Sequence, residues 1–174
     1  MTRKLFSYYY KSSVVKIILI GIFLPLIFSF LLGFAINLFS TETEPSLDFI
    51  ERIKKYTNVF FILLAIVIAP LFETLIFHYL PVKICQIVSH KRKYRNCCIV
   101  IILSSILFAF LHITSIHHFF VSLIGGFVLA FSCFVLIRRK QRPLLYTAII
   151  HAGYNGILMF AGIILKLAGI PLTT

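Results

Sequence analysis

Apolar runs long enough to cross a lipid bilayer decide what this chain can fold into. A transmembrane helix needs about 20 predominantly apolar residues, and 60% of the 174 residues here are hydrophobic. The polar stretches between the runs are too short to form a separate soluble domain. The sequence therefore predicts an all-α fold, a polytopic membrane helical bundle of about five transmembrane helices with short interfacial helices, in a single domain over residues 1–174. The predicted spans are residues 17–39, 57–80, 97–113, 119–137 and 144–167.

The distribution of basic residues predicts how the chain is oriented. A formal net charge of +12 would suit a nucleic-acid partner, but Lys and Arg lie in short clusters beside the apolar runs, as the positive-inside rule describes. Thirteen of them fall on one side of the predicted bundle and four on the other. We therefore expect a cytoplasmic N-terminus and no nucleic-acid partner. Residues 1–16 are expected to form a basic interfacial segment that contacts the lipid bilayer; the alternative is a disordered basic tail. The abundance of Ile, Phe and Lys suits an AT-rich bacterial genome, so we expect a bacterial cell membrane.

The cysteines predict neither a disulfide framework nor a zinc site. They show no Cys-x-x-Cys spacing, and most lie in or beside apolar runs. We interpret them as small apolar side chains that fill the bundle. They are Cys85, Cys97, Cys98 and Cys133.

Glu73 is the most unusual residue in the sequence. The other four acidic residues lie in the polar segment 40–56, so Glu73 is the only acid from residue 52 onward, and it stands inside an apolar run. An ionisable group at the centre of a membrane helix costs about 2.5–3.5 kcal/mol on insertion scales, and such groups usually face a cavity or a partner. We therefore predict a functional Glu73; the alternative is a protonated side chain that only hydrogen-bonds a neighbouring helix. Pro70 has no N–H and is expected to free the carbonyl of Ile66.

Further polar side chains capable of acid–base chemistry lie on other spans. His112 is near the end of the third predicted span, and His151 and Asn155 lie in the fifth. Because His151 and Asn155 are four residues apart, they share one face of a helix. A lone histidine in an apolar run is more often a core residue than a catalyst. A carboxylate, two histidines and an asparagine on three spans are better explained by a functional pocket. His117 and His118 are predicted to lie in a turn.

Three short motifs resemble those of a known family. They are Ala69-Pro70 followed by Glu73 and Phe77, then Phe108-x-x-x-His112, then His151-x-x-x-Asn155. In this order they resemble the CAAX-protease and bacteriocin-processing family, also called the Abi family, whose members are glutamic intramembrane proteases. The resemblance covers about residues 57–165. It implies that Glu73 and His112 activate a water molecule and that His151 and Asn155 stabilise an oxyanion. It also implies a peptide or protein substrate at the membrane and no cofactor or metal.

The first motif departs from the family pattern Glu-Glu-x-x-x-Arg. Thr74 stands at the position of the second glutamate, and His78 stands at the position of the arginine. The two family residues are four apart and would form an ion pair on a helix. Because both are replaced, neither is left as an unpaired charge. We expect Thr74 and His78 to hydrogen-bond in place of that pair. Phe77 and Phe108 are the other predicted supporting residues.

The predicted spans place the candidate residues at different depths in the membrane. Glu73 and His151 lie toward the cytoplasmic half, whereas His112 lies near the outer end of its span. We expect a bend at Pro70, a tilt of the second span, or a turn after His112 that is sunk into the protein to bring them together.

Three other functions are compatible with the sequence. The first is a family member with weakened catalysis that acts as a bacteriocin immunity protein or a membrane scaffold. The second is a zinc enzyme, because a carboxylate and two or three histidines can bind zinc, although the sequence has no His-Glu-x-x-His motif. The third is a proton-coupled transporter that uses Glu73, although we find no inverted repeat.

Overall fold

A computed structural model describes residues 3–39, 59–88 and 93–167, and every regular element in these ranges is helical. Four helices are long and apolar enough to cross a membrane, and a further apolar helix, Asn96–Leu111, is shorter. The predicted all-α membrane bundle is therefore confirmed. The predicted acidic segment 40–56 lies outside the described residues. The four long candidate spans are Val14–Ala35, Phe60–Val88, Ile116–Arg138 and Pro143–Ile164.

The helices are connected in a simple order. In sequence they are α1 (Arg3–Lys11), α2 (Val14–Phe39), α4 (Val59–Leu63), α5 (Ala69–Glu73), α6 (Leu80–Val88), α7 (Lys93–Leu111), α8 (Ile116–Arg138) and α9 (Pro143–Leu167). Two π-helical turns, η1 (Leu64–Ile68) and η2 (Thr74–Tyr79), join α4, α5 and α6. These five segments form one continuous helix over residues 59–88, called here the interrupted helix.

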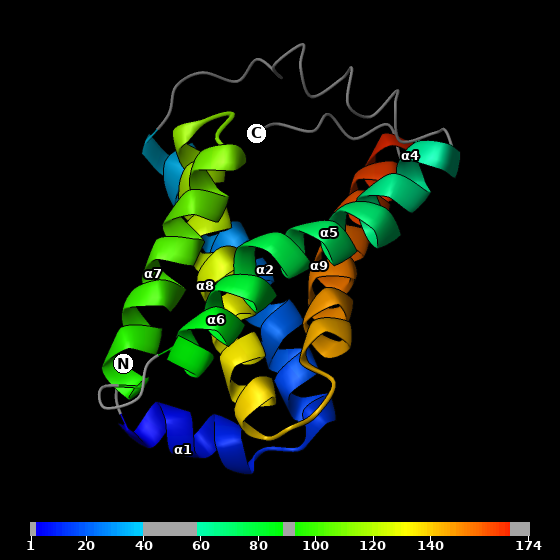
Figure 1. Ribbon diagram of the computed structural model, residues 1–174. Coiled ribbons are helices and arrows are strands. Elements are labelled where there is room, and N and C mark those ends of the chain that lie inside the picture. Colours follow the sequence, from blue (N-terminus) through cyan, green and yellow to red (C-terminus); the bar gives the residue numbers. More distant parts are fainter. Residues whose placement is uncertain (1–2, 40–58, 89–92, 168–174) are drawn as a thin grey trace.

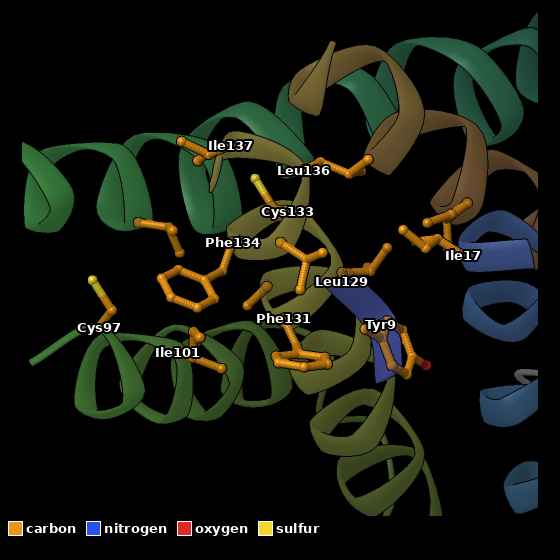
Figure 2. Packing of buried hydrophobic residues seen from close by; sticks show 14 of the residues in the cluster. Tyr9, Ile17, Cys97, Ile101, Leu129, Phe131, Cys133, Phe134, Leu136 and Ile137 are labelled. Atoms are coloured by element: carbon orange, nitrogen blue, oxygen red, sulfur yellow. The ribbon is translucent and has the colours of Figure 1, made fainter. Parts of the chain in front are cut away.

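Helix α8 forms the core of the bundle. All of its residues from 128 to 137 are buried, as expected for a helix that is apolar around its whole circumference. Figure 2 shows Phe131 and Phe134 packed among side chains that include Tyr9 of α1 and Ile101 of α7. The other helices are therefore arranged around α8.

Helix α1 lies across one end of the bundle (Figure 1). The ring of Tyr9 lies 5.0 Å from that of Phe131 in α8. Arg139, in the basic turn after α8, donates from Nη1 to the carbonyl of Ser12 at 2.5 Å. The basic N-terminal segment and the basic turn before α9 thus lie at the same end, as the predicted orientation requires; the side of the membrane that they face stays a prediction.

Glycines allow α2 and α9 to approach each other closely. A Cβ atom added at Gly21 would lie 2.7 Å from Ile150, and one added at Gly153 would lie 2.6 Å from Ile22. Both distances are too short for a real contact, so a larger residue at either glycine would require the facing isoleucine side chain to move. Small residues commonly have this role between membrane helices.

Helix α8 begins earlier than the sequence suggested. Its first residue is Ile116, and the hydroxyl of Ser115 accepts a hydrogen bond from the backbone N–H of His118. A serine in this position satisfies an N–H that has no partner inside the helix. His117 and His118 therefore lie in the first turn of α8, and their predicted placement in a turn is wrong.

Two prolines explain the form of the interrupted helix. The N–H of Ala69 donates to the carbonyl of Leu64, five residues earlier, and the next residue is Pro70. The N–H of Leu80 bonds in the same way to the carbonyl of Leu75, and the next residue is Pro81. A proline ring clashes with the carbonyl four residues before it, and the wider turn relieves this clash.

The interrupted helix crosses the bundle obliquely (Figure 1). Its first half contacts α9, the turn η2 contacts α7, α8 and α9, and α6 contacts α7 and α8. The oblique path resolves the difference in depth between the candidate residues, because it carries Glu73 between α7 and α9. Of the routes expected from the sequence, the structure shows an oblique second span, with a π-helical turn before Pro70.

Candidate active site

Two imidazole side chains from separate parts of the fold meet the carboxylate of Glu73. Its Oε2 atom lies 3.5 Å from Nε2 of His112 and 3.6 Å from Nε2 of His151. Glu73 is the last residue of α5, His112 follows α7, and His151 lies in α9. These contacts are slightly longer than ordinary hydrogen bonds, as is common for catalytic groups before a substrate is bound. The structure thus brings together three of the four predicted catalytic residues.

The backbone at the end of α7 determines how His112 faces Glu73. Nδ1 of His112 lies 2.8 Å from the carbonyl oxygen of Phe108. A carbonyl only accepts hydrogen bonds, so Nδ1 carries a hydrogen and donates it. In the neutral ring, Nε2 is then the nitrogen with a lone pair. One proton can therefore be shared between Nε2 of His112 and the Glu73 carboxylate.

His151 is held from behind by Thr74. Its Nδ1 atom lies 3.4 Å from the Thr74 hydroxyl, and both side chains are buried. When the hydroxyl donates to Nδ1, the hydrogen of the neutral ring is on Nε2, the atom that faces Glu73. His112 then presents an acceptor to the carboxylate, and His151 presents a donor.

His78 has a partner that the sequence analysis missed. Nδ1 of His78 lies 3.2 Å from the hydroxyl of Ser104 in α7, and this hydroxyl donates to the carbonyl of Phe77. The expected hydrogen bond between Thr74 and His78 is therefore wrong, because α9 and α7 supply a different partner to each. The signal in the sequence was the serine pair at residues 104 and 105, inside an apolar run and one turn before Phe108.

Phe108 packs against all three buried or half-buried imidazoles of this region. Its ring centroid lies 4.2 Å from that of His112, 5.1 Å from that of His78 and 5.6 Å from that of His151. The Phe77 ring lies 6.3 Å away. Ring packing at these separations restricts the orientation of each imidazole. Phe108 therefore forms an apolar wall of the site.

Asn155 bonds to the backbone of the interrupted helix, whereas His151 contacts side chains of that helix. Its Nδ2 atom donates to the carbonyl of Ala65 at 3.1 Å. The sequence placed the freed carbonyl at Ile66, four residues before Pro70, but in a π-helical turn the carbonyl five residues before Pro70 loses its donor. The bond from Asn155 is thus made at Ala65, one residue before the carbonyl that the sequence analysis expected to be free.

The site is more open on one side than on the other. The side chains of Glu73 and His112 are 26% and 36% exposed, whereas that of His151 is 4% exposed. A substrate would therefore approach from the side of Glu73 and His112. Phe72 and Leu111 beside these two residues are also exposed, so the approach is lined by apolar side chains.

In the described ranges, no group of three or more His, Cys, Asp or Glu side chains is placed to hold a metal ion. The hydrogen bonds of His112 and His151 at Nδ1 leave Nε2 of each ring directed at Glu73.

Comparison with protein families identifies the chain. A family model described as type II CAAX prenyl endopeptidase Rce1-like matches residues 55–157, well over half of the chain. The chain belongs to the Rce1-like family. This match confirms the resemblance that the three motifs indicated, and the matched range includes all four predicted catalytic residues.

Membership of the Rce1-like family indicates the general class of this protein. The family is one of CAAX proteases, so this is an integral membrane protein of a protease family, and proteases are hydrolases. Comparison of this Rce1-like chain with curated proteins and with solved structures finds no match.

Proposed function

We propose that this protein is a glutamic-type intramembrane endopeptidase that hydrolyses peptide bonds in peptides or proteins presented at the membrane. The observation that carries the proposal is the position of Glu73, whose Oε2 atom lies 3.5 and 3.6 Å from imidazole nitrogens of two other segments. An isolated carboxylate between two imidazoles inside a bundle suits proton transfer. The protease family of the chain supports hydrolysis as the reaction.

Glu73 and His112 act as the general base and acid. The Glu73 carboxylate takes a proton from a water molecule, and the hydroxide formed attacks the carbonyl carbon of the peptide bond. The C–N bond then breaks, and the proton passes to the leaving nitrogen. Because His112 shares that proton through Nε2, it lowers the cost of holding it between the two steps. General acid–base catalysis of this kind contributes about 10²–10⁴-fold in rate.

His151 and Asn155 stabilise the negative charge on the carbonyl oxygen. The Nε2–H group of His151 is a donor beside Glu73, and an asparagine amide has a second N–H group besides the one that bonds to Ala65. One donor of this kind is typically worth about 2.7–4 kcal/mol of transition-state stabilisation. Thr74 supports His151 by keeping the hydrogen on Nε2.

The first experiment compares membrane proteomes of cells that carry the natural protein or the Glu73→Gln variant. Glutamine keeps the size of the side chain but removes the base, so cleaved products with new C-termini should be lost. Glu42→Gln, which removes an acid from the polar segment 40–56, is the matched control and should keep every product. If no product depends on Glu73, the proposed proteolysis is wrong.

The same experiment separates the two functions that family membership leaves open. A toxin-immunity or scaffold phenotype that survives Glu73→Gln would favour a non-catalytic role. The family description names a CAAX prenyl endopeptidase, so the first defined substrates are peptides that end in Cys-a-a-X, the prenylation signal. Prenylated and unprenylated forms of one peptide, tested in lipid nanodiscs, show whether cleavage requires the lipid group.

A further inference from the structure

The wide turn η1 contains a backbone carbonyl whose usual donor is missing. In this turn the N–H of Ala69 donates to the carbonyl of Leu64, five residues earlier. In the same register, the N–H of residue 70 would reach the carbonyl of Ala65. Residue 70 is a proline, which has no N–H. In a membrane, water does not replace such a partner, so another group of the protein must satisfy the carbonyl.

Asn155 of α9 provides the missing donor. Its side-chain Nδ2 donates to the carbonyl of Ala65 at 3.1 Å. We propose that Asn155 is a positioning residue that replaces the absent N–H of Pro70 and thereby fixes the register of the wide turn η1, which presents Glu73. The catalytic consequence rests on the proposed function, whereas the effect on the fold does not.

The register of η1 determines the direction in which Glu73 points. Glu73 follows Pro70 by three residues, which is less than one helical turn. A π-helical turn contains one more residue than an α-helical turn. If η1 became an ordinary α-helical turn, the register would change by one residue, and the side chains that follow would rotate by about 100° around the helix axis. The carboxylate would then point away from His112 and His151. Because α9 carries both His151 and Asn155, the same helix bonds to the wide turn η1 and provides one partner of the carboxylate.

The positioning role can be separated from a role in oxyanion stabilisation. An asparagine amide has two N–H groups, and the bond to Ala65 uses one of them. The positioning role becomes redundant once residue 70 has its own N–H. The role in oxyanion stabilisation does not depend on residue 70.

The test is a double-mutant cycle between Pro70→Ala and Asn155→Ala in the full-length protein in nanodiscs. Asn155→Ala should lower the Tm by about 3 °C when residue 70 is proline and by less than about 1 °C when it is alanine. The loss of kcat on a prenylated Cys-a-a-X peptide should be at least about tenfold smaller with alanine at residue 70, with little change in KM.

Pro81→Ala is the matched control for this cycle. Pro81 follows η2 as Pro70 follows η1, so its replacement restores an N–H away from Asn155. It should not reduce the effect of Asn155→Ala. Equal losses with proline and alanine at residue 70, or an equal rescue by Pro81→Ala, would overturn the proposal.

A spectroscopic test does not require any proline variant to fold. The chain has four asparagines, Asn37, Asn58, Asn96 and Asn155, so ¹⁵N-asparagine labelling gives few side-chain signals, and Asn155→Gln identifies the one of interest. One of the two Asn155 side-chain protons should exchange slowly with deuterium. Rapid exchange of both would refute the hydrogen bond. Because this measurement uses no substrate, its outcome is independent of whether the protein is a protease.

Discussion

Helix α8 and the interrupted helix are both long enough to cross a membrane, but they are built differently. In the apolar window of α8 67% of the residues are buried, compared with 11% in the interrupted helix. Helix α8 is α-helical from Ile116 to Arg138, whereas the interrupted helix changes to a π-helical turn before each of two prolines. Helix α8 is stabilised by packing of its side chains against the surrounding helices. The backbone of the interrupted helix accepts hydrogen bonds from Ser104 of α7 and Asn155 of α9.

This difference separates stability from chemistry within one small bundle. The regular helix carries the packed core, and the irregular backbone occurs in the helix that carries the carboxylate. Single π-helical turns inside α-helices often lie at functional sites. Substitutions in α8 should therefore change stability with little effect on the cleavage rate of folded protein, and substitutions around Glu73 should do the reverse.

Among the side chains that contact Glu73 or its partners, the largest effect is expected at the two imidazoles that face the carboxylate. His112→Gln and His151→Gln should each lower kcat at least about a hundredfold, because they remove the acid–base partner and an oxyanion donor. His78→Gln is the matched control and should keep most of the activity, since His78 bonds to Ser104. Cleavage kinetics of purified variants give the values. Equal losses at His78 and His112 would contradict these assignments and place His78 in the water-activating group.

A smaller effect is expected at Thr74. Thr74→Val keeps the shape of the side chain but removes the hydroxyl beside Nδ1 of His151. With the donor gone, the ring hydrogen is no longer held on Nε2, and we expect kcat to fall by about tenfold with little change in KM. Thr74→Ser retains the hydroxyl and should stay within about threefold of the natural protein. An equal loss in the serine and valine variants would show that the hydroxyl is not what matters.

The smallest effect on catalysis is expected in α8. Phe134 is almost fully buried in the core, and Phe134→Ala should lower the free energy of unfolding by about 3–5 kcal/mol. The kcat of the protein that remains folded should change by less than about twofold, because Phe134 lies outside the site. Thermal unfolding and active-site titration measure the two quantities. A large loss of kcat per folded molecule would contradict the claim that α8 contributes to stability and not to catalysis.

Much of the site could be predicted because polar groups are rare in this sequence. Glu73 is the only acid after residue 51, and the cost of an ionisable group in a membrane requires partners for it. Few side chains could supply them, so His112 and His151 were identifiable without coordinates.

The exact backbone partners could not be predicted. An α-helical and a π-helical turn at Pro70 differ by one residue of register, and the partner of the Ala65 carbonyl is Asn155, which comes from another helix. The pairing of Thr74 with His151 likewise depends on how α9 packs against the interrupted helix. These two contacts join residues 77 and 90 positions apart in the chain, and spacing within one helix does not reveal them.

The central claim is that Glu73 activates water to break a peptide bond, and hydrolysis in ¹⁸O-labelled water tests it most directly. The purified protein in nanodiscs is given a membrane peptide, and the new C-terminal carboxyl group is analysed by mass spectrometry. We predict that this group contains ¹⁸O with the natural protein and that Glu73→Gln lowers the rate of its formation by about a thousandfold. Cleavage by Glu73→Gln at the natural rate would contradict the account.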